Sequence, residues 1–180
     1  MKKLRKVLPK SLRNALSFYF EFLVSPKQAF LDINKKTLED VVHDYLFLLL
    51  CFGILAGVSS IVINLAKAIY VNFFLHATVQ YFRMLNYTIG RGVTTTFFFI
   101  FAGTFLLFVA TIIILFFIRG IKYTEICKIA MGSMAPAIFF GWLQISPIVF
   151  VVWSTVLIII GINEQKKNRK IRRDSIENRD

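Results

Sequence analysis

The side chains that could do chemistry in this chain are few and lie far apart. His43 and Asp44 stand just before the first long apolar run, His76 follows that run, and Glu125 opens a later one. A general base must reach the proton that it removes, and a metal site needs several converging ligands. No motif joins these residues, and the chain has no glycine-rich phosphate-binding loop or nucleophile elbow. The sequence therefore predicts a non-enzymatic protein without catalytic, cofactor-binding or metal-binding residues.

The polar residues inside the apolar runs favour the same interpretation. Beyond Glu125 at the first residue of one run, they contain no Asp, Glu or His, which proton-coupled carriers and intramembrane proteases generally need within the membrane. Lys128 lies one turn inside a run, where its ammonium can reach the interface. Ser60, Asn64 and several threonines could bond between helices, which is their commoner use. They could also line a pore, so the alternative prediction is a small transporter or channel subunit.

The length of the apolar runs defines the fold class. Hydrophobic residues make up 57% of the 180 residues. Residues 126–162 carry one charge, and this run of 37 residues is too long for one membrane helix and about right for two. We expect an all-α integral membrane bundle with an amphipathic helix near its amino terminus. The predicted spans are 45–66, 93–118, 125–143 and 147–162, with an outer loop at 67–92.

The charges cluster outside these spans. Residues 1–44 hold nine Lys and Arg against five acids, and residues 163–180 hold seven against four. Because basic segments stay on the cytoplasmic side, we expect both termini in the cytoplasm. The first segment is predicted to be basic and amphipathic, and the last to be a basic tail. Flanking positive charge indicates anionic lipid as a partner and disfavours nucleic acid.

Small residues at helical spacing predict where the spans pack. Gly53 and Gly57 form a GxxxG pair, which lets two helix backbones approach closely. Ser133, Ala137 and Gly141 recur every four residues in the third span. Pro136 beside this stripe predicts a kinked helix packed closely on a neighbour. Other membrane proteins, or a second copy of the chain, are the expected partners.

Three stretches carry a family resemblance. They are Ser25-Pro26 with Phe30 and Ile33; the segment 119–125 around Gly120; and residues 130–136, ending at Pro136, followed by Trp153, Leu157 and Gly161-Ile162. On these residues the chain resembles the YIP family of multispanning, Ypt/Rab-interacting membrane proteins. That family has a fifth span where this chain carries a charged tail of 18 residues.

The resemblance implies a role and a set of partners. It implies a scaffold in membrane organisation or trafficking, with a small GTPase as a partner by resemblance alone. The lack of a long acidic or proline-rich arm favours a prokaryotic-type relative that lacks the last span, which would lie in the plasma membrane.

Overall fold

The protein is an all-α bundle, as the apolar runs predict. The computed structural model describes residues 10–74, 81–117, 121–143 and 147–177, and these contain helices and no strand. The helices are α1 (Lys10–Val24), α2 (Pro26–Ile33), α3 (Leu38–Phe74), α4 (Tyr81–Phe117), α5 (Tyr123–Ser133), α6 (Ala135–Phe140), the 3-10 turn η2 (Gly141–Leu143) and α7 (Pro147–Glu177).

Four stretches of this helix set are long and apolar enough to cross a membrane. They are Leu38–Phe74, Phe82–Phe116, Tyr123–Leu143 and Ile148–Lys170. The fold class is therefore confirmed, and the chain is an integral membrane protein. Large apolar side chains face outward on α3, α4 and α7, which is stable only in lipid or against a partner.

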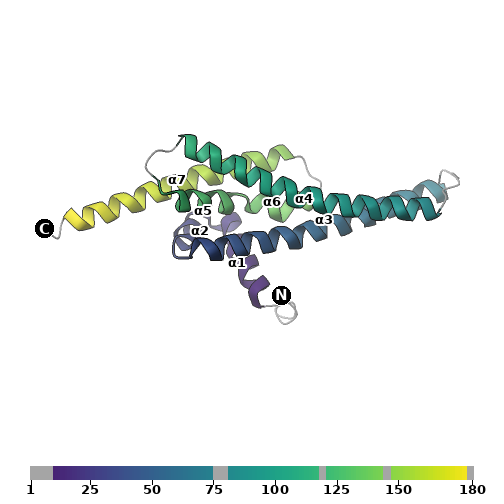
Figure 1. Cartoon of the computed structure of the whole chain (residues 1–180), viewed down its shortest axis with the longest axis horizontal. Helices are drawn as coiled ribbons and strands as arrows, with labels where there is room; N and C mark the ends of the chain where they lie inside the picture. Colours follow the sequence, from purple (N-terminus) through teal and green to yellow (C-terminus); the bar gives the residue numbers. More distant parts are fainter. Residues whose placement is uncertain (1–9, 75–80, 118–120, 144–146, 178–180) are drawn as a thin grey trace.

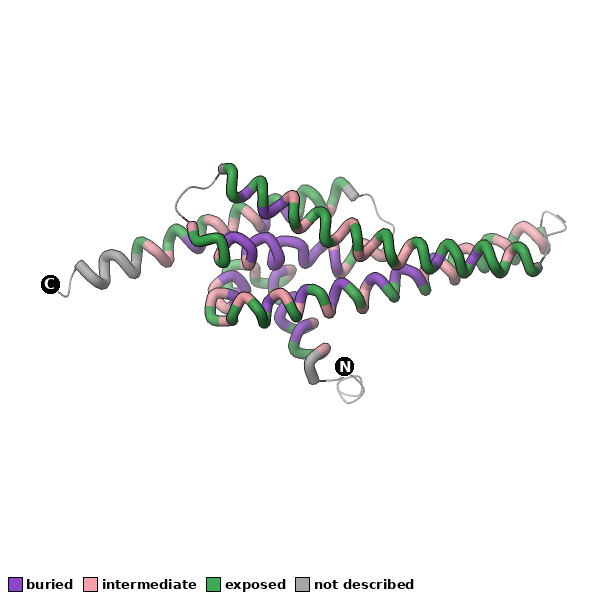
Figure 2. Tube along the Cα trace, in the orientation of Figure 1, coloured by how far each residue is buried: buried purple, intermediate pink, exposed green. Residues whose placement is uncertain are grey.

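The third span is the centre of the bundle. Of the residues in its apolar stretch of 18, 61% are buried inside the protein, against 17% in the corresponding stretch of the second span. Figure 2 shows the buried residues gathered on α5 and on the elements around it. Helices α2, α3, α4 and α7 all pack on α5, and α1 reaches both α5 and α6.

The kink expected at Pro136 is present. Helix α5 ends at Ser133, and α6 begins at Ala135 with Pro136 in its first turn. Proline lacks the N–H that would continue the α5 ladder, so the helix breaks one to two residues before it. Ala137 and Gly141 of the expected stripe of small residues both line a groove described below, and Gly141 also contacts Phe99 of α4. Ser133, before the break, is fully buried.

Helices α1 and α2 form an amino-terminal cap on the bundle. Ala15, Phe18, Tyr19 and Phe22 of α1 are buried, while Phe20 is 53% exposed. The predicted amphipathic helix therefore packs on the protein's own spans. Helix α2 begins at Pro26, whose fixed φ suits the first helical position.

The structure differs from the predicted outer loop at 67–92. Helix α3 continues to Phe74 and α4 begins at Tyr81, so most of the expected loop is helical. Figure 1 shows α3 and α4 extending side by side beyond the rest of the bundle. At 1.5 Å per residue, the 37 residues of each helix span about 55 Å, more than the roughly 30 Å hydrocarbon core. We call residues 61–74 and 81–92 the distal arm.

Most of the predicted basic tail continues the helix of the last span and is not a separate segment. Helix α7 continues without a break from Pro147 to Glu177, through the basic residues that follow the last span. Good helix formers such as Glu, Gln, Lys and Arg fill this stretch, so the helix propagates past the membrane. It points away from the distal arm (Figure 1).

The GxxxG pair of α3 packs on α4. A methyl group added at Gly57 would lie 2.0 Å from Thr96 Oγ1 and 2.7 Å from the carbonyl oxygen of Gly92. One added at Gly53 would lie 2.9 Å from Ile100. The two backbones therefore approach through glycine, as small-residue packing in membranes requires.

Replacement of Gly57 tests this seam. Because the carbonyl oxygen of Gly92 cannot move without the helix, Gly57→Leu should lower the free energy of unfolding by about 1–3 kcal/mol or more. The matched control is Gly90→Leu, since Gly90 has open space around it. Unfolding by a denaturing detergent in mixed micelles measures both. Equal stability of the two variants would contradict the seam.

Candidate functional site

A polar layer lies where the cap meets α3, α5 and α7. Lys36 Nζ is 2.8 Å from Asp44 Oδ2 and 3.6 Å above the ring of Phe18. Lys128 of α5 donates a hydrogen bond of 2.5 Å to the carbonyl oxygen of Lys36. This lysine, predicted to reach the interface, holds the α2–α3 connection against α5. A hydrogen bond from a charged donor contributes about 1.5–3 kcal/mol.

Helix α7 joins the polar layer through two side chains. The Gln165 amide donates to Asn34 Oδ1, and Asn34 Nδ2 donates to the carbonyl oxygen of Phe30 at 2.9 Å. Arg169 lies 2.7 Å from Glu125 at the start of α5. Two residues of the basic extension are thus tied to the bundle. Sequence reasoning missed this network; the one signal was a lone Gln165 among charged residues.

Aromatic rings of the cap pack directly on glycines of the spans. A methyl group added at Gly161 of α7 would lie 2.8 Å from the Phe30 ring and 2.9 Å from Ile129. One added at Gly132 of α5 would lie 2.5 Å from the Phe22 ring. The rings of Phe22 and Phe30 meet edge to face at 5.0 Å. Sequence reasoning had singled out neither Phe22 nor Gly132.

The residues of the family resemblance are only partly brought together. Phe30 and Gly161 are in contact, and Pro26 begins the helix that carries Phe30. Trp153 is 47% exposed on α7, and Pro136 is buried in α6. Gly120 lies outside the described residues. Of this set, Phe30 and Gly161 are therefore explained by their packing against each other.

Three of the residues weighed for chemistry are engaged in other contacts, and the fourth, His76, lies outside the described residues. The His43 ring stacks on Phe47, Asp44 pairs with Lys36, and Glu125 pairs with Arg169. Within the described ranges, no group of three His, Cys, Asp or Glu could hold a metal. In the cap, burial raises the pKa of Tyr19 well above its ordinary value, and its hydroxyl donates to the carbonyl oxygen of Val41.

A lateral apolar groove opens between α4 and α7. Its volume is about 670 Å³. Met134, Ala137, Ile138, Gly141 and Trp142 form the floor. Residues of α4 from Thr95 to Ile113 form one wall and residues of α7 from Phe150 to Ile159 form the other, with Tyr45, Leu49 and Ala56 of α3 below. No sequence pattern predicted this groove, because its lining residues come from four separate helices.

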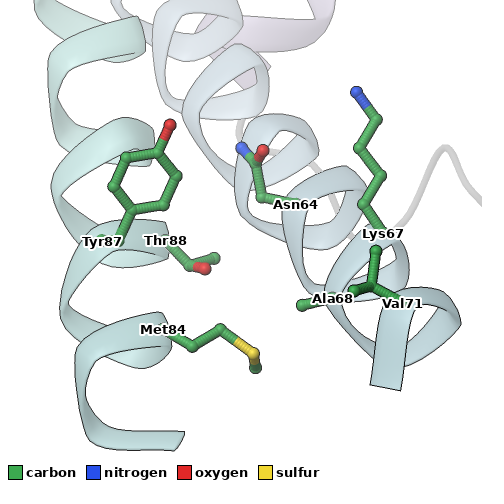
Figure 3. Close-up of a pocket in the computed structure, with 7 residues that line it drawn as sticks. All are labelled: Asn64, Lys67, Ala68, Val71, Met84, Tyr87 and Thr88. Carbon is green, nitrogen blue, oxygen red and sulfur yellow. The ribbon is translucent and has the colours of Figure 1, made fainter. Parts of the chain in front are cut away.

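A smaller pocket of about 240 Å³ lies within the distal arm (Figure 3). Asn64 and Lys67 of α3 and Tyr87 and Thr88 of α4 are among the residues that line it. Asn64 Nδ2 donates to the carbonyl oxygen of Ser60 at 2.8 Å, and Arg91 Nε donates to the Tyr87 hydroxyl at 2.9 Å.

The hydroxyl groups of the spans bond mainly to their own helices. Thr95, Thr96, Thr104, Thr111 and Thr155 each donate to the carbonyl oxygen four residues earlier. This is how hydroxyls are commonly satisfied in a membrane helix. Nothing in these bonds requires a pore, and the transporter or channel alternative stays a prediction.

Comparison of the chain with family models, with curated proteins and with solved structures finds no match. The resemblance to the YIP family therefore stays a prediction based on short motifs. The fold and the contacts above are the observations on which a function can be argued.

Removal of the Phe30 ring tests the attachment of the cap. Phe30 is fully buried against α5 and α7, so Phe30→Ala should lower the free energy of unfolding by about 3–5 kcal/mol. Phe20→Ala is the matched control. Because Phe20 is half exposed, its replacement should lower the free energy of unfolding much less. Detergent unfolding measures both. A Phe30→Ala variant as stable as the control would show that the cap is not docked.

Proposed function

We propose that the protein is a non-enzymatic membrane scaffold that acts through helix–helix contacts with a second copy or another membrane protein. The distal arm is the observation that carries this proposal. It extends beyond the other spans as a two-helix hairpin, and Gly92 at its base packs against Ile61 and Gly57 of α3. Its outward side chains, including Ile69, Tyr70 and Phe73, are more than half exposed.

The physical argument is the amount of unpartnered surface. An exposed apolar patch of this extent marks a surface that a membrane or a protein partner covers. The arm adds about 20 Å of hairpin, which exceeds the headgroup region on one side of a bilayer. Association of such helices in lipid depends on side-chain packing, so no catalytic group is needed. The YIP resemblance supports a trafficking-type role with a small GTPase among the partners.

Cross-linking from the arm tests the proposal. A photoreactive amino acid at Ile69 should give a protein adduct in native membranes, and mass spectrometry would identify a second copy or a different protein. The matched control places the same group at Val152, which is 59% exposed on α7 outside the groove. Protein adducts in equal yield from both positions, or lipid adducts alone from Ile69, would contradict a scaffold acting through the arm.

We propose that both termini are cytoplasmic and that the membrane is the plasma membrane of a prokaryote. The support is the excess of Lys and Arg in residues 1–44 and 163–180 over the segment between the first two apolar runs. The contacts between the cap and the basic part of α7 at the polar layer support a common side of the membrane for both.

A reporter fusion tests this orientation. A reporter that is active only in the cytoplasm, fused after Asp180, should be active, because the basic extension of α7 resists translocation. The control is a reporter that is active only after export, fused at the same position, which should be inactive. Activity of the exported-active reporter after Asp180 would reverse the proposed topology.

A further inference from the structure

The lateral groove is a second surface, separate from the distal arm. Along α4 it runs from Thr95 to Ile113, which is about 27 Å at 1.5 Å per residue. That length is close to the thickness of the hydrocarbon core. The groove is therefore an elongated space at membrane depth, aligned with the spans.

Three polar side chains that line the groove have hydrogen-bond partners within the protein. The Tyr45 hydroxyl donates to the carbonyl oxygen of Gly103 at 3.0 Å, and Thr155 Oγ1 donates to the carbonyl oxygen of Val151 at 2.8 Å. Trp142 Nε1 donates to the carbonyl oxygen of Phe139 at 2.7 Å. An occupant with its own hydrogen-bonding groups would leave them unpaired, at a cost. The occupant must therefore be apolar along the groove.

The volume of the groove suits a small apolar ligand. At about 670 Å³ it lies in the range of sites for single small ligands, about 300–1,000 Å³. Hydrocarbon chains fit this space.

The basic residues next to the groove indicate an anionic lipid. On α7, Lys166 and Lys170 follow the groove residue Ile159 by seven and eleven residues, which keeps them on the same face of the helix. Both lysines are exposed. They lie about 10–17 Å beyond Ile159 along the helix, toward the polar layer. An anionic headgroup above the groove would meet these two ammonium groups.

We propose that the groove binds a phospholipid from the leaflet on the side of the polar layer. Its acyl chains lie between α4 and α7, and Lys166 and Lys170 hold its anionic headgroup. This proposal concerns a different surface from the scaffold proposal, so either one can fail while the other stands.

Trp142 lines the end of the groove away from Lys166 and Lys170, so it gives a direct readout of the ends of the acyl chains. The probe is phosphatidylglycerol brominated near the methyl ends of its chains, which quenches tryptophan on contact, compared with phosphatidylcholine brominated at the same carbons. The full-length Trp153→Phe variant leaves Trp142 as the sole tryptophan, and Trp142→Phe leaves Trp153, which faces outward and does not line the groove. In vesicles of unlabelled phosphatidylcholine, brominated phosphatidylglycerol should quench Trp142 at a several-fold lower mole fraction than the brominated choline lipid. Trp153 should show no such preference.

Two further variants separate the chains from the headgroup. Ala102→Phe should fill the groove and abolish the preference, whereas Val152→Phe, on an exposed face of α7, should preserve it. Lys166→Gln with Lys170→Gln should make the two quenching curves coincide while the protein stays folded. Equal quenching of Trp142 by both lipids, absence of quenching, or a preference that survives Ala102→Phe would each overturn the proposal.

Discussion

The arrangement of the bundle depends on two aromatic rings that pack on glycine. Phe22 and Phe30 project from the cap and lie against Gly132 of α5 and Gly161 of α7. Glycine is required at both places because any larger side chain would displace a ring that is itself fully buried. These contacts bring α5 and α7 together on the cap, and the polar layer of Lys36, Lys128 and Gln165 follows from that approach. The cap is therefore part of the core rather than an attachment at its edge.

Much of the fold could be predicted because the membrane limits the choices. Apolar runs of sufficient length can only be helices in lipid, so the all-α class and the broad positions of the spans followed from composition. Pro136 predicted the break in the third span for an equally local reason. The ends of α3, α4 and α7 could not be predicted in this way. Hydropathy falls where a helix leaves the bilayer, so it marks the end of the apolar part. Helix propensity does not fall there, and all three helices continue beyond their apolar parts.

The candidate sites were less predictable, since each is assembled from separate helices. The pairing of Gly161 with Phe30 joins residues 131 positions apart, and no spacing rule links them. The groove is lined by α3, α4, α6 and α7 together, and the break at Pro136 and the packing of Gly141 against Phe99 position the α6 part of its lining. Its lining residues look like any other membrane sequence. The distal arm and the groove give the molecule two apolar surfaces, one suited to a protein and one to hydrocarbon chains.

The attachment of the cap to the last span can be measured directly. In a full-length variant with Cys51 and Cys127 replaced by alanine, Asn34→Cys and Gln165→Cys place one thiol on the cap and one on α7, at side chains that contact each other. A short bifunctional thiol reagent applied to native membranes should join them within one chain in high yield. Single-cysteine variants should give no such product. Failure of the double variant to cross-link, while both thiols react with a monofunctional reagent, would contradict a cap docked against α5 and α7.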